Sequence, residues 1–250
     1  MGIGFVFVIG LIIGSFLNVC IYRIIREESV VFPPSHCTSC GYELRALDLI
    51  PVVSYAFLRG RCRICSEKIS IRYPVVELLN GILYIMVYVN YGLTLDFFML
   101  CLFISLLIVV GFIDFDTKYV FNSTVNFGFI SAGVFLIFKW LENKSIPWNN
   151  IFGGVIGFAI IALIVVLTRA MGEGDIDIAL ICGLFLGVKG IIVTLFLAFV
   201  LGGILAILSI VLKIKSREDE MAFGPYLAIG AVVAALWGEN LIEIYSMLFL

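Results

Sequence analysis

The chain has 250 residues, of which 62% are hydrophobic and only 14% are charged. Soluble domains are roughly 45–50% apolar, so the composition excludes an ordinary soluble domain and indicates a polytopic membrane protein. The net charge is only −2, but half of the sixteen Lys and Arg residues fall within residues 23–72. Because basic residues in short loops mark the cytoplasmic side of a membrane, this segment is predicted to be cytoplasmic.

Eight apolar runs are predicted to cross the membrane, since a transmembrane helix needs ~20 predominantly apolar residues. Alternation from an outside N-terminus puts thirteen of the sixteen Lys and Arg residues on the cytoplasmic side. The same alternation places Asp114 and Asp175 on that side. A missed span between the two aspartates would have put them on opposite sides of the membrane. The runs are 3–21, 75–91, 95–113, 121–138, 151–168, 176–188, 191–212 and 225–245.

The first apolar run is followed, rather than preceded, by its basic residues Arg23 and Arg26, which is the reverse of a signal peptide. It is therefore predicted to remain as a transmembrane helix within residues 1–22. Residues 23–74 are predicted to form a small cytoplasmic domain, and residues 75–250 a transmembrane core. The expected fold is all-α, with about eight transmembrane helices and a small domain between helices 1 and 2.

Four of the seven cysteines form two Cys-x-x-Cys pairs, Cys37 with Cys40 and Cys62 with Cys65, separated by 21 residues. Two such turns can direct four thiolates at one zinc ion, and this closed site is typical of structural zinc. Disulfides are the competing interpretation, but thiols stay reduced in the cytoplasm, which favours zinc. A nucleic-acid partner is not expected, because acidic residues offset the basic ones and few aromatic residues are available for stacking.

Several hydrolytic mechanisms are excluded by what the chain lacks. The only histidine, His36, adjoins the first cysteine pair, so a His-Glu-x-x-His zinc protease cannot be built. No Gly-x-Ser-x-Gly turn occurs, which argues against a serine hydrolase. No Gly-x-x-x-x-Gly-Lys-Ser/Thr loop is present, which argues against ATP hydrolysis. Paired carboxylates remain as the means of activating water.

Asp114 and Asp175 each lie where a long apolar run meets a polar loop. Carboxylates at the edge of a bilayer are costly and usually functional. Gly172 and Gly174 belong to the tetrapeptide Gly-Glu-Gly-Asp that ends at Asp175, and they allow a tight bend and close approach of a substrate. We expect the two aspartates to share one proton, so that one accepts a proton from water while the other polarises a carbonyl. Helix capping is the alternative role.

Short motifs run in order from the first apolar segment to the last. They are Gly-Ser-Phe-Leu-Asn-Val at 14–19, the two cysteine pairs, Asp-Leu-Ile-Pro-Val-Val-Ser-Tyr at 48–55, Arg-Tyr-Pro-Val-Val-Glu at 72–77, Ile-Asp at 113–114, Gly-Glu-Gly-Asp at 172–175 and Phe-Gly-Pro-Tyr-Leu at 223–227. In this order they resemble the prepilin peptidases, also called type IV leader peptidases, of the bacterial cytoplasmic membrane.

The resemblance implies cleavage of the basic leader from prepilins or pseudopilins at the cytoplasmic face, with Asp114 and Asp175 as the catalytic aspartates. It also implies N-methylation of the new N-terminus by S-adenosylmethionine, and a zinc domain that serves methylation and stability. Glu77 and Asn18 are polar residues of membrane helices that could line the methyl-donor pocket. They could equally satisfy neighbouring helix ends.

The chain departs from the family pattern at some positions near the second aspartate and elsewhere. Asp177 stands where a lysine is usual, and Val120-Phe121-Asn122 lacks the usual proline.

Two alternative functions stay open. One is a transporter with a zinc-stabilised cytoplasmic domain, although transporter acids are expected near the bilayer midplane. The other is a peptidase without methyltransferase activity.

Overall fold

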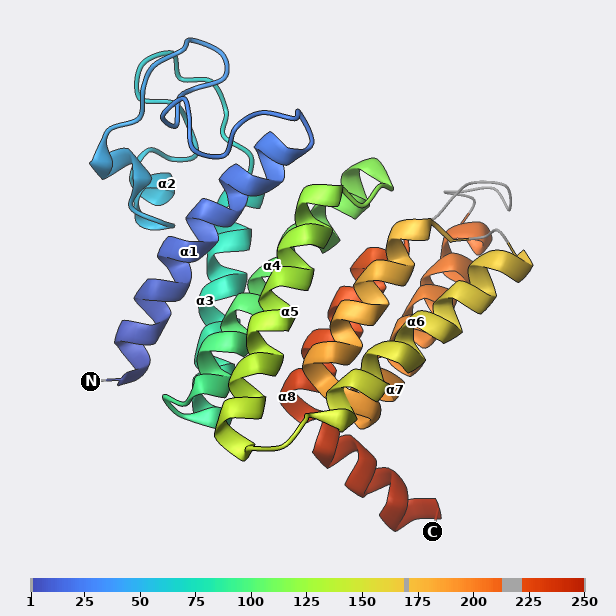
Figure 1. The fold of residues 1–250 in the computed structure, drawn as a ribbon. Coiled ribbons are helices and arrows are strands. Elements are labelled where there is room, and N and C mark those ends of the chain that lie inside the picture. The colour runs from blue at the N-terminus through green and yellow to red at the C-terminus, as the bar shows by residue number, and fades with distance from the viewer. Residues whose placement is uncertain (1, 169–170, 213–221, 250) are drawn as a thin grey trace. The chain divides into compact units, whose positions relative to one another are not determined.

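The computed structural model describes residues 2–168, 171–212 and 222–249, and nearly all of them outside the cysteine-rich segment are helical (Figure 1). The predicted loop 213–221 and residues 169–170 lie outside the described residues. Contacts divide the chain into two compact units, Met1–Val109 and Val110–Leu250. The elements are α1 (Gly2–Ile24), η1 (Ala46–Leu49), α2 (Val53–Phe57), α3 (Arg72–Tyr91), α4 (Leu95–Thr117), α5 (Asn122–Asn143), α6 (Trp148–Thr168), α7 (Glu173–Val211) and α8 (Gly224–Phe249).

In the first unit, α1 packs closely against α3 because glycines of α1 face it. Gly10 and Gly14 lie directly against the α3 backbone, and small residues permit this approach in a membrane. The buried Asn80 amide donates to the carbonyl oxygen of Gly10 at 2.7 Å and accepts the Ser105 hydroxyl of α4 at 3.2 Å. Tyr84 extends the chain of bonds to Ser105 at 2.9 Å. These bonds fix the register of the three helices.

The segment between α1 and α3 forms a small module at one end of these two helices (Figure 1). It contains η1 and α2 together with both cysteine pairs. Its described residues form no β-strand, only isolated bridges between His36 and Glu43 and between Arg61 and Lys68. The predicted small domain between helices 1 and 2 is confirmed. It is designated the cysteine module below, residues 25–71.

In the second unit, α7 contains both the sixth and the seventh predicted apolar runs. The backbone of Gly157 in α6 lies against Ala179 and also against Ile191, although twelve residues of straight helix would separate these two by ~18 Å. The chain therefore reverses direction within α7, at Gly187, whose φ of 71° and ψ of −174° are not helical. The positive φ explains a glycine at this position.

Two asparagines at the start of α6 stabilise this reversal. The Asn150 amide donates to the carbonyl oxygen of Leu184 at 2.9 Å, and the N–H of Val188 donates to the Asn149 side-chain oxygen at 3.4 Å. A break in a membrane helix leaves backbone groups without intrahelical partners, so side chains must replace those bonds. α6 thus holds both arms of α7 in place.

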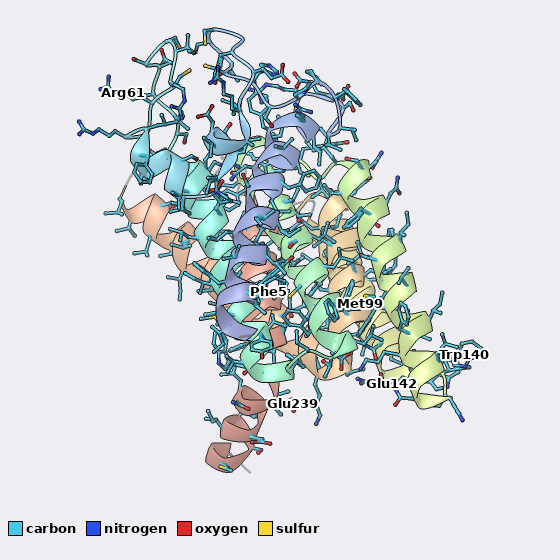
Figure 2. The ribbon with its side chains drawn as sticks, turned by 90° about the vertical axis from the view of Figure 1, so that its left-hand side faces the viewer. Phe5, Arg61, Met99, Trp140, Glu142 and Glu239 are labelled. Atoms are coloured by element: carbon cyan, nitrogen blue, oxygen red, sulfur yellow. The ribbon has the colours of Figure 1, made fainter. Side chains whose placement is uncertain are left out.

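Seven of the described helices are long and apolar enough to cross a membrane. Because α7 folds back on itself, all eight predicted apolar runs are present as helical segments, and the predicted all-α fold is confirmed. Figure 2 shows Trp140 and Glu142 together near the end of α5, where an aromatic ring typically lies at the membrane surface.

The close contact of α6 with α7 predicts that a larger side chain at this interface destabilises the fold. A side chain at Gly183 would collide with the Gly153 backbone, whereas Gly203 of the same helix has open space. We expect Gly183→Ala to destabilise the fold by about 1–3 kcal/mol through overpacking. Gly203→Ala is the control and should not lower stability. Thermal unfolding of both variants in detergent measures the difference, and equal midpoints would contradict this packing.

Candidate functional site

Asp114 lies one turn before the end of α4 and is only 4% exposed. Its Oδ2 accepts the N–H of Gly224, the first residue of α8, at 2.8 Å. A helix N-terminus carries unpaired N–H groups and partial positive charge, so it favours a carboxylate. The neighbouring Asp116 is exposed, as expected if only one of the two faces the interior.

Gly224 is a site residue to which sequence reasoning assigned no role. A Cβ at this position would lie 2.7 Å from Oδ2 and 3.0 Å from Cγ of Asp114, so a larger residue would displace the carboxyl group. The available signal was the Gly-Pro pair, because Pro225 at the start of a helix fixes where α8 begins.

Asp175 lies in the first turn of α7 and is 5% exposed. Its N–H donates to the carbonyl oxygen of Gly172, the residue that precedes the helix, at 3.1 Å. Gly174 lies against the Val120 side chain, and a Cβ there would come within 2.5 Å of Val120 Cβ. The two predicted glycines therefore let α7 start beside the connection that follows α4.

The two buried aspartates lie in one unit and close enough to interact electrostatically. Each is associated with a helix N-terminus, Asp114 with α8 and Asp175 with α7. Asp177 is half-buried, so the unusual acid lies near the pair without being enclosed like Asp175. Two interacting carboxyl groups can share a proton and activate water between them.

The depth of Asp175 follows from the pairing of α6 with α7. Gly157 lies against Ala179, and antiparallel helices continue this pairing in opposite directions. From this register we infer that Asp175, four residues before Ala179, lies level with Ile161, ~10 Å before the end of α6 at Thr168. The carboxyl group is therefore recessed below the end of its neighbouring helix.

The four predicted metal-ligating cysteines converge in the cysteine module. Their sulfur atoms all lie within 4.8 Å of one another, with Cys37 to Cys65 at 3.8 Å and Cys40 to Cys62 at 3.9 Å. A tetrahedral ion bound to thiolates at ~2.3 Å sets its ligands ~3.8 Å apart, so the four thiols fit such an ion. Hydrogen bonds from the backbone N–H groups of Cys65 and Ile64 lower the pKa of the Cys62 thiol to about 6.

The two cysteine turns share one hydrogen-bond pattern. The N–H of Cys37 donates to the carbonyl oxygen of Tyr42, and that of Cys62 to Glu67, both at 2.8 Å. Each turn also has a positive φ directly after its second cysteine, at Gly41 and at Ser66. The module is thus a structural repeat that the sequence did not reveal, because outside the cysteines its two copies share few residues.

A charged contact joins the two turns. The Asp48 side chain is 2% exposed and accepts Arg63 Nε at 2.9 Å and Nη2 at 2.6 Å. The hydroxyl of Tyr42, from the first turn, also donates to Asp48 at 3.2 Å. The Arg63 hydrogen bond lowers the pKa of the Asp48 carboxyl. Arg61, two residues earlier, is exposed and extends away from the module (Figure 2).

Asn18 and Glu77 line a common cavity of about 400 Å³ in the first unit, bounded by α1, α3 and the cysteine module. The Asn18 amide donates to the carbonyl oxygen of Tyr73 at 3.0 Å. Glu77 accepts the N–H of Val52 at 2.7 Å and a hydrogen bond from Ser15. A cavity of this volume is in the range that small-molecule ligands occupy.

Comparisons with known proteins identify two family domains in this chain. Residues 8–91 match the bacterial peptidase A24 N-terminal domain, and residues 101–207 match the type IV leader peptidase family. The chain is 30% identical over 244 residues to a prepilin leader peptidase/N-methyltransferase of Bacillus subtilis, with 96% of each chain covered.

Two further relatives carry the same name. The one from Pseudomonas putida is 32% identical and covers 96% of this chain and 91% of its own length. The one from Neisseria gonorrhoeae is 35% identical, with 89% and 86% covered. No solved structure matches this chain significantly. The family matches and these near full-length relatives show that the chain belongs to the type IV leader peptidase family.

Proposed function

We propose that this chain cleaves the basic leader peptide from prepilins or pseudopilins and N-methylates the new N-terminus. The observation that carries the proposal is the pair of buried aspartates, Asp114 and Asp175, each at a helix N-terminus of one unit. Burial of two acids among apolar helices is costly, and it is retained where the acids do chemistry.

In this mechanism Asp114 and Asp175 share one proton. The ionised carboxylate accepts a proton from water as the water attacks the scissile carbonyl, and the protonated carboxyl donates a hydrogen bond to the carbonyl oxygen. The N–H of Gly224 orients the Asp114 carboxyl group. Gly172 and Gly174 support the loop that places Asp175 beside it.

We propose zinc as the ion of the four cysteines, because four thiolates at tetrahedral spacing form a closed zinc site. Zinc would link the two turns of the cysteine module and contribute to its folding, as structural zinc does in other small domains. With all four positions held by cysteine, the site has no place for a substrate.

We propose that the cavity holds S-adenosylmethionine, which supplies the methyl group, with Asn18 and Glu77 in its lining. The four zinc-site cysteines belong to the same unit as this cavity. That arrangement supports a role for the cysteine module in methylation as well as stability.

The helices and the family point to a multi-pass protein of the bacterial inner membrane. Its orientation is a proposal drawn from charge: the N-terminus outside, and the cysteine module and both aspartates on the cytoplasmic side. We further propose residues 1–22 as the first span, 23–74 as the zinc domain and 75–250 as the protease core in the lipid bilayer. Nucleic acid has no part in this function.

The aspartate pair predicts a selective loss of cleavage. Asp114→Ala and Asp175→Ala should each reduce leader cleavage by roughly 10²–10⁴-fold, because each removes one member of the acid–base pair. Asp116→Ala is the matched control, since that side chain is exposed and should leave cleavage intact. Mass spectrometry of a prepilin incubated with each membrane-embedded variant measures the loss. Full cleavage by either of the first two variants would reject the pair.

The contact of Gly224 with Asp114 predicts a second effect. Gly224→Ala should displace the carboxyl group and lower cleavage by roughly 100-fold, as misplacement of a reacting group by ~1 Å does. Gly238→Ala in the same helix meets only an ordinary contact and should cleave normally. The cleavage rates of both variants under single-turnover conditions test this, and an unaffected Gly224→Ala would show that the contact is unimportant.

The Asp48–Arg63 contact predicts how firmly the zinc is held. Arg63→Ala should release zinc roughly tenfold faster, because groups that orient a metal site commonly matter to that extent. Arg61→Ala removes an arginine that makes no such contact and should retain zinc like the unmodified chain. Zinc transfer to a coloured chelator measures the rates. Identical release from the two variants would argue against the contact as a support of the zinc site.

A further inference from the structure

Glu77 is a buried carboxylate whose hydrogen-bond partners within the described residues are neutral. It is 7% exposed, and among residues 2–168, 171–212 and 222–249 no ion pair includes it. The two arginines of the cavity lining are engaged elsewhere, the buried Arg23 with the carbonyl oxygens of Ser29 and Pro33 and the exposed Arg63 with Asp48. A buried charge without a counter-charge is costly, which points to a positively charged ligand in the cavity.

The Glu77 carboxylate is held in place by groups from two directions. It accepts the N–H of Val52, from the cysteine module, at 2.7 Å, and a hydrogen bond from Ser15 of α1. Both partners are neutral donors, so they orient the carboxylate without neutralising its charge.

The turn that supplies one of these donors is strained. Val52 has φ 61° and ψ −47°, and the N–H of Val53 bonds to the carbonyl oxygen of Pro51 across it, which together define a classic γ-turn. This turn is rare, and a β-branched residue at positive φ is an outlier. Such strain persists where surrounding structure imposes it, commonly at functional sites. Here the strained turn aims an N–H at Glu77.

We propose that Glu77 binds the newly exposed α-ammonium group of the cleaved substrate and accepts its proton for methyl transfer. This inference rests on the proposed N-methyltransferase function. The ammonium gives one proton to the Glu77 carboxylate, and the freed amine lone pair forms a bond to the methyl carbon. The carbon–sulfur bond of the sulfonium donor breaks, its electron pair stays on sulfur, and a neutral thioether leaves.

The amine is a better match to this carboxylate than the sulfonium is. An α-amine with a pKa of about 7.7–8.0 is largely protonated at neutral pH and cannot attack until it loses a proton. A carboxylate beside the sulfonium would instead stabilise a charge that disperses in the transition state, which slows the reaction. The geometry and the chemistry therefore both favour the role of proton acceptor.

Other charged groups line the same cavity and must be considered in any pH profile. Apart from Glu77 and three tyrosines, the titratable or charged groups are Arg23, His36, Cys37, Asp48, Cys62, Arg63, Glu67 and Lys68. Glu77→Gln leaves all of these in place. It also keeps an acceptor oxygen for the N–H of Val52, so the strained turn can be retained.

The test compares Glu77→Gln with Glu43→Gln, an exposed glutamate outside the cavity lining. A prepilin is incubated with each full-length variant and S-adenosylmethionine, and leader loss and methyl gain are read from its mass at pH 6 to 8.5. We expect Glu77→Gln to cleave normally but to methylate roughly 10²-fold more slowly at pH 6. The deficit should narrow about tenfold per pH unit towards the amine pKa, as the amine deprotonates without help.

A binding measurement separates the amine from the sulfonium. Calorimetry with S-adenosylmethionine, and with its neutral product S-adenosylhomocysteine, should give the same affinities for Glu77→Gln as for the unmodified chain. Weaker binding of either compound would overturn the proposal, because Glu77 would then contact the donor. A loss for S-adenosylmethionine alone would indicate contact with the sulfonium, and a loss for both would indicate contact with the donor's own α-ammonium group. A methylation deficit that is constant with pH, or no deficit, would overturn it as well.

If the chain has no methyltransferase activity, the same assays give a different result. An unmodified chain that cleaves but never methylates would reject the methyltransferase proposal and this inference with it. Normal methylation by the Glu77→Gln variant would reject only the inference about Glu77 and would leave the methyltransferase proposal in place. Glu43→Gln should match the unmodified chain in every assay.

Discussion

The second unit is organised around two carboxyl groups that must be buried among apolar helices. Asp114 meets the N-terminus of α8 and Asp175 lies in the first turn of α7, so both are placed where backbone N–H groups are unpaired. Helix ends are the polar groups that a membrane protein can offer without exposing backbone to lipid. The position of α8 is therefore tied to Asp114, and a glycine at Gly224 is what the contact requires.

The reversal of α7 makes this arrangement possible. Because the chain turns back at Gly187, the first arm can start beside the α4–α5 connection while the second arm packs against α8. Asn149 and Asn150 replace the backbone bonds lost at the turn. Features far from the aspartates thus set the register that brings them together.

The first unit is also stabilised by polar interactions, but these lie mainly in the cysteine module. The cysteine module has few apolar residues in its interior, so the fold relies on the four clustered cysteines, the ion pair of Asp48 with Arg63 and repeated turn hydrogen bonds. Its polar contacts with the membrane helices include the strained turn at Val52, which Glu77 of α3 holds, and the bonds of Arg23 of α1 to the carbonyl oxygens of Ser29 and Pro33. Stability and the shape of the cavity therefore depend on the same few polar contacts.

Much of this protein was determined by local features of the sequence. Apolar length gave the helices, the unequal distribution of basic residues gave the expected topology, and the cysteine spacing gave the four-thiol cluster. Asp114 and Asp175 were also identifiable, because acids next to long apolar runs are costly. Each of these signals lies within a short stretch of chain.

Only the tertiary structure decided how distant segments meet. It joined two predicted spans into α7 by a reversal at Gly187, and it placed Gly224 against a carboxyl group 110 residues earlier. It also showed that Glu77 holds a strained turn in the cysteine module. Periodicity and composition report the preferences of neighbouring residues, whereas these contacts depend on the packing of helices far apart in the chain, which no local pattern encodes.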